Sequence, residues 1–78
     1  MTNQEKIENI ISNTEYFIYE IENIDEYNAR QFEVELYDDI KEVSFFLDIN
    51  LYEMTMCEIN PKTRQRVAYQ DIKSEYLK

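Results

Sequence analysis

The chain has 78 residues, no glycine, histidine or tryptophan, and a net charge of −9 from 17 acidic and 8 basic residues. A chain of this length forms one small domain, spanning residues 1–78, which excludes two-half dinucleotide folds and barrel enzymes. The lack of glycine excludes phosphate-cradling loops, and the lack of histidine excludes serine-type triads and the common zinc sites.

The first third of the chain predicts one amphipathic helix over residues 3–26. Thr2 and Glu5 have the spacing of a capping box, which marks the start of a helix. A mainly apolar set then recurs at intervals of three and four, namely Ile7, Ile10, Ile11, Thr14, Phe17, Ile18, Ile21 and Ile24. Because residues 16–19 favour strands, a helix over residues 3–12 followed by a strand is the alternative. We favour the long helix.

From Gln31 onward the apolar period changes to two, which predicts strands over residues 31–37, 42–48, 51–59 and 64–70. Turns at residues 38–41, 49–50 and 61–62 place one set of side chains on the same face, because they pair Leu36 with Val43, Leu47 with Tyr52 and Met56 with Val67. We therefore expect an α+β fold, with one N-terminal helix packed on a four-stranded antiparallel β-meander.

The expected core lies between the helix and one face of the sheet. It comprises Ile7, Ile10, Ile11, Phe17, Ile18, Ile21, Val34, Leu36, Val43, Phe45, Leu47, Met54, Met56 and Val67. The last segment, residues 71–78, is expected to form a short helix or to fray.

The lack of a recognisable targeting signal and the presence of a single cysteine favour a reducing compartment. No run approaches the roughly 18 apolar residues of a membrane helix, and residues 1–5 lack the features of a signal peptide. The single cysteine, Cys57, forms no internal disulfide and is interpreted as a small inert residue. Residues with AT-rich codons (Phe, Tyr, Met, Ile, Asn, Lys) far outnumber Gly, Ala, Arg and Pro. We therefore expect a cytoplasmic protein of a low-GC bacterial host or its phage.

The charge is unevenly distributed along the chain. Residues 1–58 have a net charge of −12, whereas residues 59–78 have +3, from Lys62, Arg64, Arg66, Lys73 and Lys78 against two acids. In the expected sheet, alternate residues of one strand lie about 6.6 Å apart, so carboxylates on the outer face form rows. That face is expected to carry Glu33, Glu35, Tyr37, Glu42, Ser44, Phe46, Asp48, Glu53, Thr55 and Cys57.

Two interpretations of this acidity compete. In one, the acidic residues only keep a small protein soluble. In the other, they form a surface that meets a basic one, such as the nucleic-acid groove of another protein. In size, acidity and codon usage the chain resembles the small acidic proteins that phages use against bacterial defence, among them anti-restriction and anti-CRISPR proteins. Several of these are nucleic-acid mimics, which the resemblance implies as an expectation here.

The leading hypothesis is a non-enzymatic inhibitor that binds a basic nucleic-acid-handling protein or complex and occupies its DNA or RNA site. Direct nucleic-acid binding is disfavoured by the net charge of −9, and we expect no membrane partner, cofactor, metal or catalytic residue. The alternative is a structural or regulatory interaction module, of which a homodimer is one form. The candidate partner-binding residues are Glu33, Glu35, Tyr37, Asp38, Asp39, Glu42, Phe46, Asp48 and Glu53.

Overall fold

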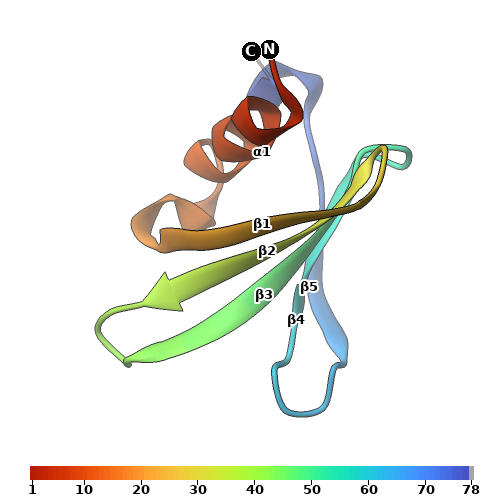
Figure 1. Ribbon diagram of the computed structural model, residues 1–78. Helices are drawn as coiled ribbons and strands as arrows, with labels where there is room; N and C mark the ends of the chain where they lie inside the picture. The colour runs from red at the N-terminus through yellow and green to blue at the C-terminus, as the bar shows by residue number, and fades with distance from the viewer. Residues whose placement is uncertain (78) are drawn as a thin grey trace.

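In the computed structural model, which describes residues 1–77, one helix packs on a five-stranded antiparallel sheet. The strands lie side by side in chain order, so the sheet is a twisted meander, and α1 lies beside residues 74–77 (Figure 1). The predicted α+β class is confirmed, but the predicted number of strands, four, is wrong. The elements are α1 (Asn3–Ser12), η1 (Glu15–Ile18), β1 (Glu20–Asn28), β2 (Gln31–Asp38), β3 (Val43–Asn50), β4 (Thr55–Ile59), β5 (Arg66–Asp71) and η2 (Ser74–Leu77).

Helix α1 begins as the sequence predicts. The hydroxyl of Thr2 accepts the backbone N–H of Glu5 at 3.1 Å, and the Glu5 carboxylate accepts the backbone N–H of Thr2 at 3.0 Å. These two bonds satisfy backbone donors that the first turn leaves without helical partners. The helix buries Ile7, Ile10 and Ile11 against the sheet.

The predicted long helix over residues 3–26 is wrong beyond Ser12, and its second half forms the edge strand β1. The misleading signal is the spacing of Ile21 and Ile24, which both lie on the core side although they are three residues apart. A β-bulge at Glu22 inserts one extra residue between the paired positions, so a strand reproduces a helix-like interval here. The alternative of a helix over residues 3–12 followed by a strand therefore describes the structure better.

The core lies between α1 and one face of the sheet. It confirms Ile7, Ile10, Ile11, Val34, Leu36, Leu47 and Met56 as buried, with Ile21, Phe45 and Met54 partly buried beside them. It adds Tyr16, Phe32, Ile49 and Ile72. Four residues predicted to be in the core are exposed. Phe17 (66%) and Ile18 (65%) are exposed because α1 ends before them, and Val43 (50%) and Val67 (46%) because they lie at the ends of strands.

The turns that follow β2, β3 and β4 share one local design. In each, the side-chain oxygen of a residue at the strand end accepts backbone N–H groups two and three residues further on: Asp38, Asn50 and Asn60. Four residues after each of these lies a left-handed residue: Glu42 (φ 57°), Met54 (φ 55°) and Arg64 (φ 62°). Glycine normally fills such positions, and this chain has none.

This turn design shifts every predicted strand register. The structure pairs Leu36 with Phe45, Leu47 with Glu58 and Met56 with Gln70, where the sequence predicts Val43, Tyr52 and Val67 as the partners. The first two shifts are even numbers of residues, so the predicted faces of β2 and β3 survive although the pairs do not. In β5 a bulge at Ala68 (φ 54°) changes the phase as well.

The C-terminal segment returns to α1. The backbone N–H of Ile72 bonds to the carbonyl of Met54 at 2.8 Å, and η2 packs Tyr76 and Leu77 against the core cluster. A short helix is therefore present in the segment predicted to form one or fray. Lys78 belongs to the segment 71–78 and to the basic residues of 59–78 named in the sequence analysis, but it lies outside the described residues.

Candidate partner-binding face

Five of the nine candidate residues meet on the face of the sheet opposite α1. In the β2–β3 ladder Glu33 lies directly opposite Asp48, and Glu35 lies opposite Phe46. Tyr37 continues the same row at the end of β2. The alternation of β2 and β3 therefore places these side chains together, as the sequence predicts.

The other four candidates lie in or next to the turns at the two ends of β3. Asp38 is the last residue of β2, and Asp39 and Glu42 follow it in the β2–β3 turn, where one oxygen of Asp38 is already used by the backbone N–H groups of Ile40 and Lys41. Glu53 lies in the β3–β4 turn and lines a hollow of about 180 Å³ that reaches back to Asp48. The candidates thus form one row on the sheet with a group at each end.

Asp48 differs from the expected exposed carboxylate, because it is only 8% exposed. It accepts a hydrogen bond of 2.7 Å from the Tyr27 hydroxyl and forms an ion pair with Arg66. Sequence periodicity identified its face but not these partners, which come from β1 and β5. The Asp48 charge is therefore compensated within the chain.

Two basic residues from the C-terminal part of the chain, Arg64 and Arg66, pair with acidic residues of this row on the sheet. The Arg64 guanidinium lies 3.4 Å from the Glu33 carboxylate and 5.6 Å from the centre of the Phe46 ring. Arg64 and Arg66 also line, with Asp25 and Tyr27, a hollow of about 490 Å³ over this face. The exposed aromatic anchor expected at Phe46 is thus covered in part by a guanidinium of the same chain.

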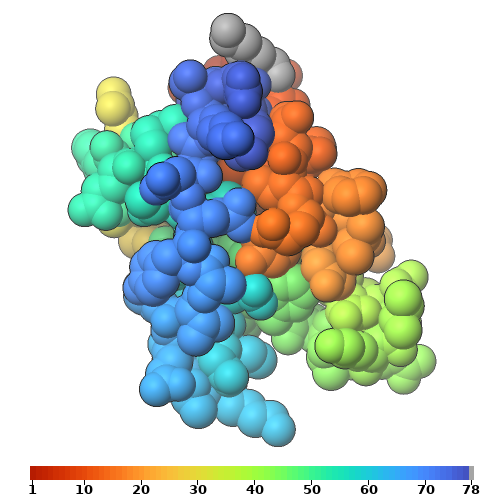
Figure 2. Space-filling model, turned by 180° about the vertical axis from the view of Figure 1, so that it is seen from behind, coloured from red at the N-terminus to blue at the C-terminus, as the bar shows by residue number. Residues whose placement is uncertain are grey.

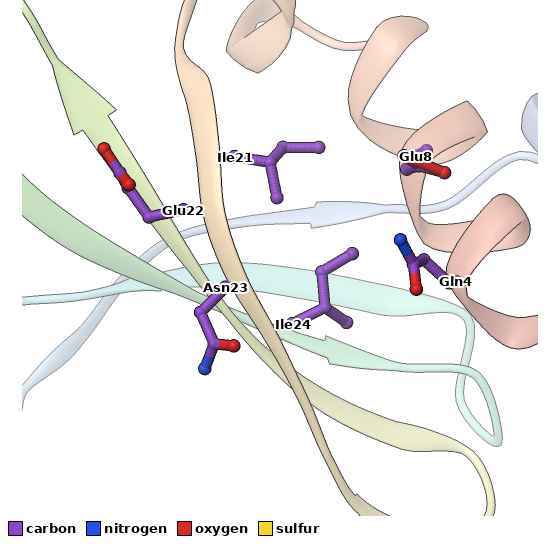
Figure 3. A pocket seen from close by; sticks show the side chains of 6 residues that line it. All are labelled: Gln4, Glu8, Ile21, Glu22, Asn23 and Ile24. Atoms are coloured by element: carbon purple, nitrogen blue, oxygen red, sulfur yellow. The ribbon is translucent and has the colours of Figure 1, made fainter.

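Strand β1 adds acidic residues that the sequence analysis assigned to a helix or left aside. Asp25 lies directly opposite Glu33, and Glu20 lies opposite Tyr37, so both extend the acidic row. Figure 3 shows Ile21 and Ile24 pointing toward α1, whereas Glu22 projects from the other side of the strand. We call Glu20, Glu22, Asp25, Glu33 and Glu35 the acidic face.

Cys57 lies on the same side of the sheet but is buried. Burial raises the pKa of its thiol, although the Arg66 guanidinium nitrogen lies 4.0 Å from the sulfur. The thiol therefore stays protonated near neutral pH, consistent with its interpretation as an inert residue.

The comparisons with known proteins give no relative: no family model, curated protein or solved structure matches this chain. Within residues 1–77, no helix is long and apolar enough to cross a membrane.

Proposed function

We propose that this chain is a non-enzymatic acidic protein that binds a basic nucleic-acid-handling protein and occupies its DNA or RNA site. The observation that supports this most is the charge of the edge strand β1 and of its neighbour β2. β1 and β2 carry seven acidic residues and no basic one: Glu20, Glu22, Asp25, Glu26, Glu33, Glu35 and Asp38. Glu26, opposite the buried Phe32, and Asp38, in phase with the buried Leu36, lie on the other side of the sheet. The strip of negative charge therefore consists of the other five, which are the acidic face.

The acidic face contains two like charges that face each other across neighbouring strands, an arrangement that lowers the stability of a sheet. Asp25 and Glu33 are directly opposed in the β1–β2 ladder, and the pairing of Glu33 with Arg64 offsets part of this cost. A local arrangement that opposes folding is expected where function requires it. The opposed pair therefore favours a surface selected for its charge over one that only needs to be hydrated.

The spacing of the strip suits a partner that normally holds a phosphate backbone. Carboxylates on alternate residues lie about 6.6 Å apart and those on neighbouring strands about 4.8 Å apart. A groove lined with Lys and Arg binds such an array for the same electrostatic reason that it binds DNA or RNA. The same charge accelerates association with a basic protein at low salt.

The proposal is tested by capture of a partner and its displacement. The tagged chain is incubated with the nuclease-treated lysate of a low-GC bacterium, and the retained proteins are identified by mass spectrometry. We expect a basic nucleic-acid-binding protein that added duplex DNA or RNA displaces and that higher salt weakens. Recovery of the bait alone, or of a partner indifferent to nucleic acid, contradicts the proposal.

A further inference from the structure

An aromatic hollow lies on the other side of the β2–β3 turn from the acidic face. It has a volume of about 450 Å³ and opens between η1 and the start of β3, segments that lie side by side in Figure 2. Its walls include the rings of Tyr16, Tyr19 and Phe45. Tyr19 and Phe45 meet edge to face with centroids 5.0 Å apart, and Tyr16 lies 6.2 Å from Phe45.

Three carboxylates surround these rings. Glu15, Asp38 and Glu58 line the hollow, with Lys41 as the one cationic lining residue. Each of the three uses an oxygen for an internal bond: Glu58 accepts the Tyr16 hydroxyl at 2.9 Å, Glu15 accepts the Gln70 amide, and Asp38 holds its turn. Among residues 1–77 none of the three is in an ion pair. The hollow therefore combines aromatic walls with an excess of negative charge.

We infer that this hollow binds a guanidinium, the side chain of an arginine on the partner protein. A guanidinium is attracted both to the faces of aromatic rings and to carboxylates, and it carries its charge at every physiological pH. An aliphatic side chain would desolvate the three carboxylates without pairing them, which costs free energy. An anionic group would be repelled by them.

The described residues show a guanidinium over an aromatic ring twice, and in one case together with a carboxylate. Arg64 lies over the Phe46 ring at 5.6 Å while pairing with Glu33, and Arg30 lies over the Tyr52 ring at 5.5 Å. In the aromatic hollow the rings and carboxylates are assembled in the same combination, but the one lining cation is Lys41 at the rim. The hollow thus has the rings and the carboxylates of this arrangement but no guanidinium, which an arginine of the partner protein would supply.

The identity of the partner as a nucleic-acid-handling protein rests on the function proposed above, whereas the chemistry of the hollow is independent of it. Basic sites for phosphate are rich in arginine, so an acidic strip and an arginine-binding hollow serve the same target. Asp38 lines the hollow as the last residue of β2, the strand that also carries Glu33 and Glu35 of the acidic face.

The test uses two probes of nearly the same shape, one with a charged guanidinium and one with a neutral ureido group. N-acetyl-arginine methylamide and its neutral citrulline counterpart are titrated into the isotope-labelled chain, and NMR signals of the Tyr19 and Phe45 rings are followed. We expect saturable shifts with the arginine probe, in the millimolar range typical of one small contact (1 mM corresponds to about −4 kcal/mol), and much smaller shifts with citrulline. Equal responses to both probes, or none at these rings, overturn the inference.

Variants at the rim keep the test independent of folding. Lys41→Gln removes the competing cation from an exposed turn, so the arginine probe should bind about two- to fivefold more tightly, whereas Glu15→Gln should weaken it by a similar factor. Lys62→Gln, in an exposed turn outside the hollow, serves as the matched control and should leave binding of the arginine probe unchanged. Weaker binding by Lys41→Gln contradicts a cationic occupant.

The two proposals fail separately. If the arginine probe binds but no nucleic-acid-handling protein is captured, the hollow stands and the proposed function falls. If such a protein is captured but the probe leaves the Tyr19 and Phe45 signals unchanged, the proposed function stands and the arginine-binding role of the hollow is wrong.

Discussion

The Tyr27 hydroxyl donates a hydrogen bond of 2.7 Å to the Asp48 carboxylate, which connects the edge strand β1 to β3 across β2. Arg66 on β5 pairs with the same carboxylate from the other side. Asp48 therefore ties three non-adjacent strands together on the face that α1 does not cover. The Asp48 charge stabilises the fold, whereas Glu20, Glu22 and Asp25 of the acidic face are exposed.

Loss of Arg66 should destabilise the fold more than loss of Arg64. Arg66→Met leaves the buried Asp48 carboxylate with Tyr27 as its remaining charge-stabilising partner, which should lower the free energy of unfolding by about 1–3 kcal/mol. Arg64→Met removes an exposed pair with Glu33 and should cost at most about 1 kcal/mol. Urea unfolding of both variants measures the difference, and an equal or larger loss for Arg64→Met contradicts the assigned role of Asp48.

The exposed left-handed turn residue Glu42 should gain from replacement by glycine. Glu42→Gly relieves the steric cost of φ 57° and should raise the free energy of unfolding by about 0.5–1 kcal/mol. Glu53→Gly is the matched control, because Glu53 lies in the next turn and is not among the positive-φ residues. It should lower stability, because glycine there only increases the freedom of the unfolded chain. Thermal unfolding measures the stability of both variants. A lower stability of Glu42→Gly than of the unsubstituted chain contradicts the left-handed conformation at Glu42.

The stability of the fold should decline at alkaline pH through Tyr16. Burial raises the pKa of the Tyr16 hydroxyl, and its hydrogen bond to Glu58 raises it further. Above about pH 10 the unfolded chain releases this proton and the folded chain keeps it, so the free energy of unfolding falls as pH rises, by up to about 1.4 kcal/mol per pH unit. Tyr16→Phe should reduce this slope, and Tyr52→Phe, at an exposed tyrosine, should preserve the part due to Tyr16. An unchanged slope in Tyr16→Phe would show that Tyr16 ionises normally.

The sequence was sufficient for the faces of the central strands but not for the number of strands. Strict alternation in β2 identified Val34 and Leu36 as core and Glu33 and Glu35 as the opposite face. In β1 the bulge at Glu22 breaks that alternation, so periodicity alone assigned the segment to a helix. A bulge is set by pairing with the next strand, which a single segment does not reveal.

The candidate site was predictable to a similar degree. Alternation brought Glu33, Glu35 and Phe46 together correctly. It did not show that Arg64 covers Phe46, because that contact depends on the β4–β5 turn folding back over the sheet. It also missed Asp25, whose position opposite Glu33 exists only once β1 is a strand.

The proposed function predicts a monomer. Two copies pairing through their β1 edges would bring together eight acidic residues, four from each Glu20–Asn28 segment, and β5 is interrupted by the bulge at Ala68. Light scattering at low and high salt measures the mass in solution. A dimer that persists at high salt and buries the acidic face would favour the alternative of a homodimeric interaction module.

The most direct test reverses charges on the acidic face and, separately, away from it. The first variant carries Glu22→Lys, Asp25→Lys and Glu35→Lys, and the control carries Glu8→Lys, Asp71→Lys and Glu75→Lys. Each replaces three acids by three lysines, so both change the net charge from −9 to −3. Circular dichroism confirms that both fold. Their binding to the captured partner is then measured in competition with duplex DNA or RNA.

We expect the first variant to lose binding and the control to keep most of it, because contact with the basic site depends on where the charges lie. If the two folded variants bind equally well, the acidic face is not the surface that occupies the nucleic-acid site.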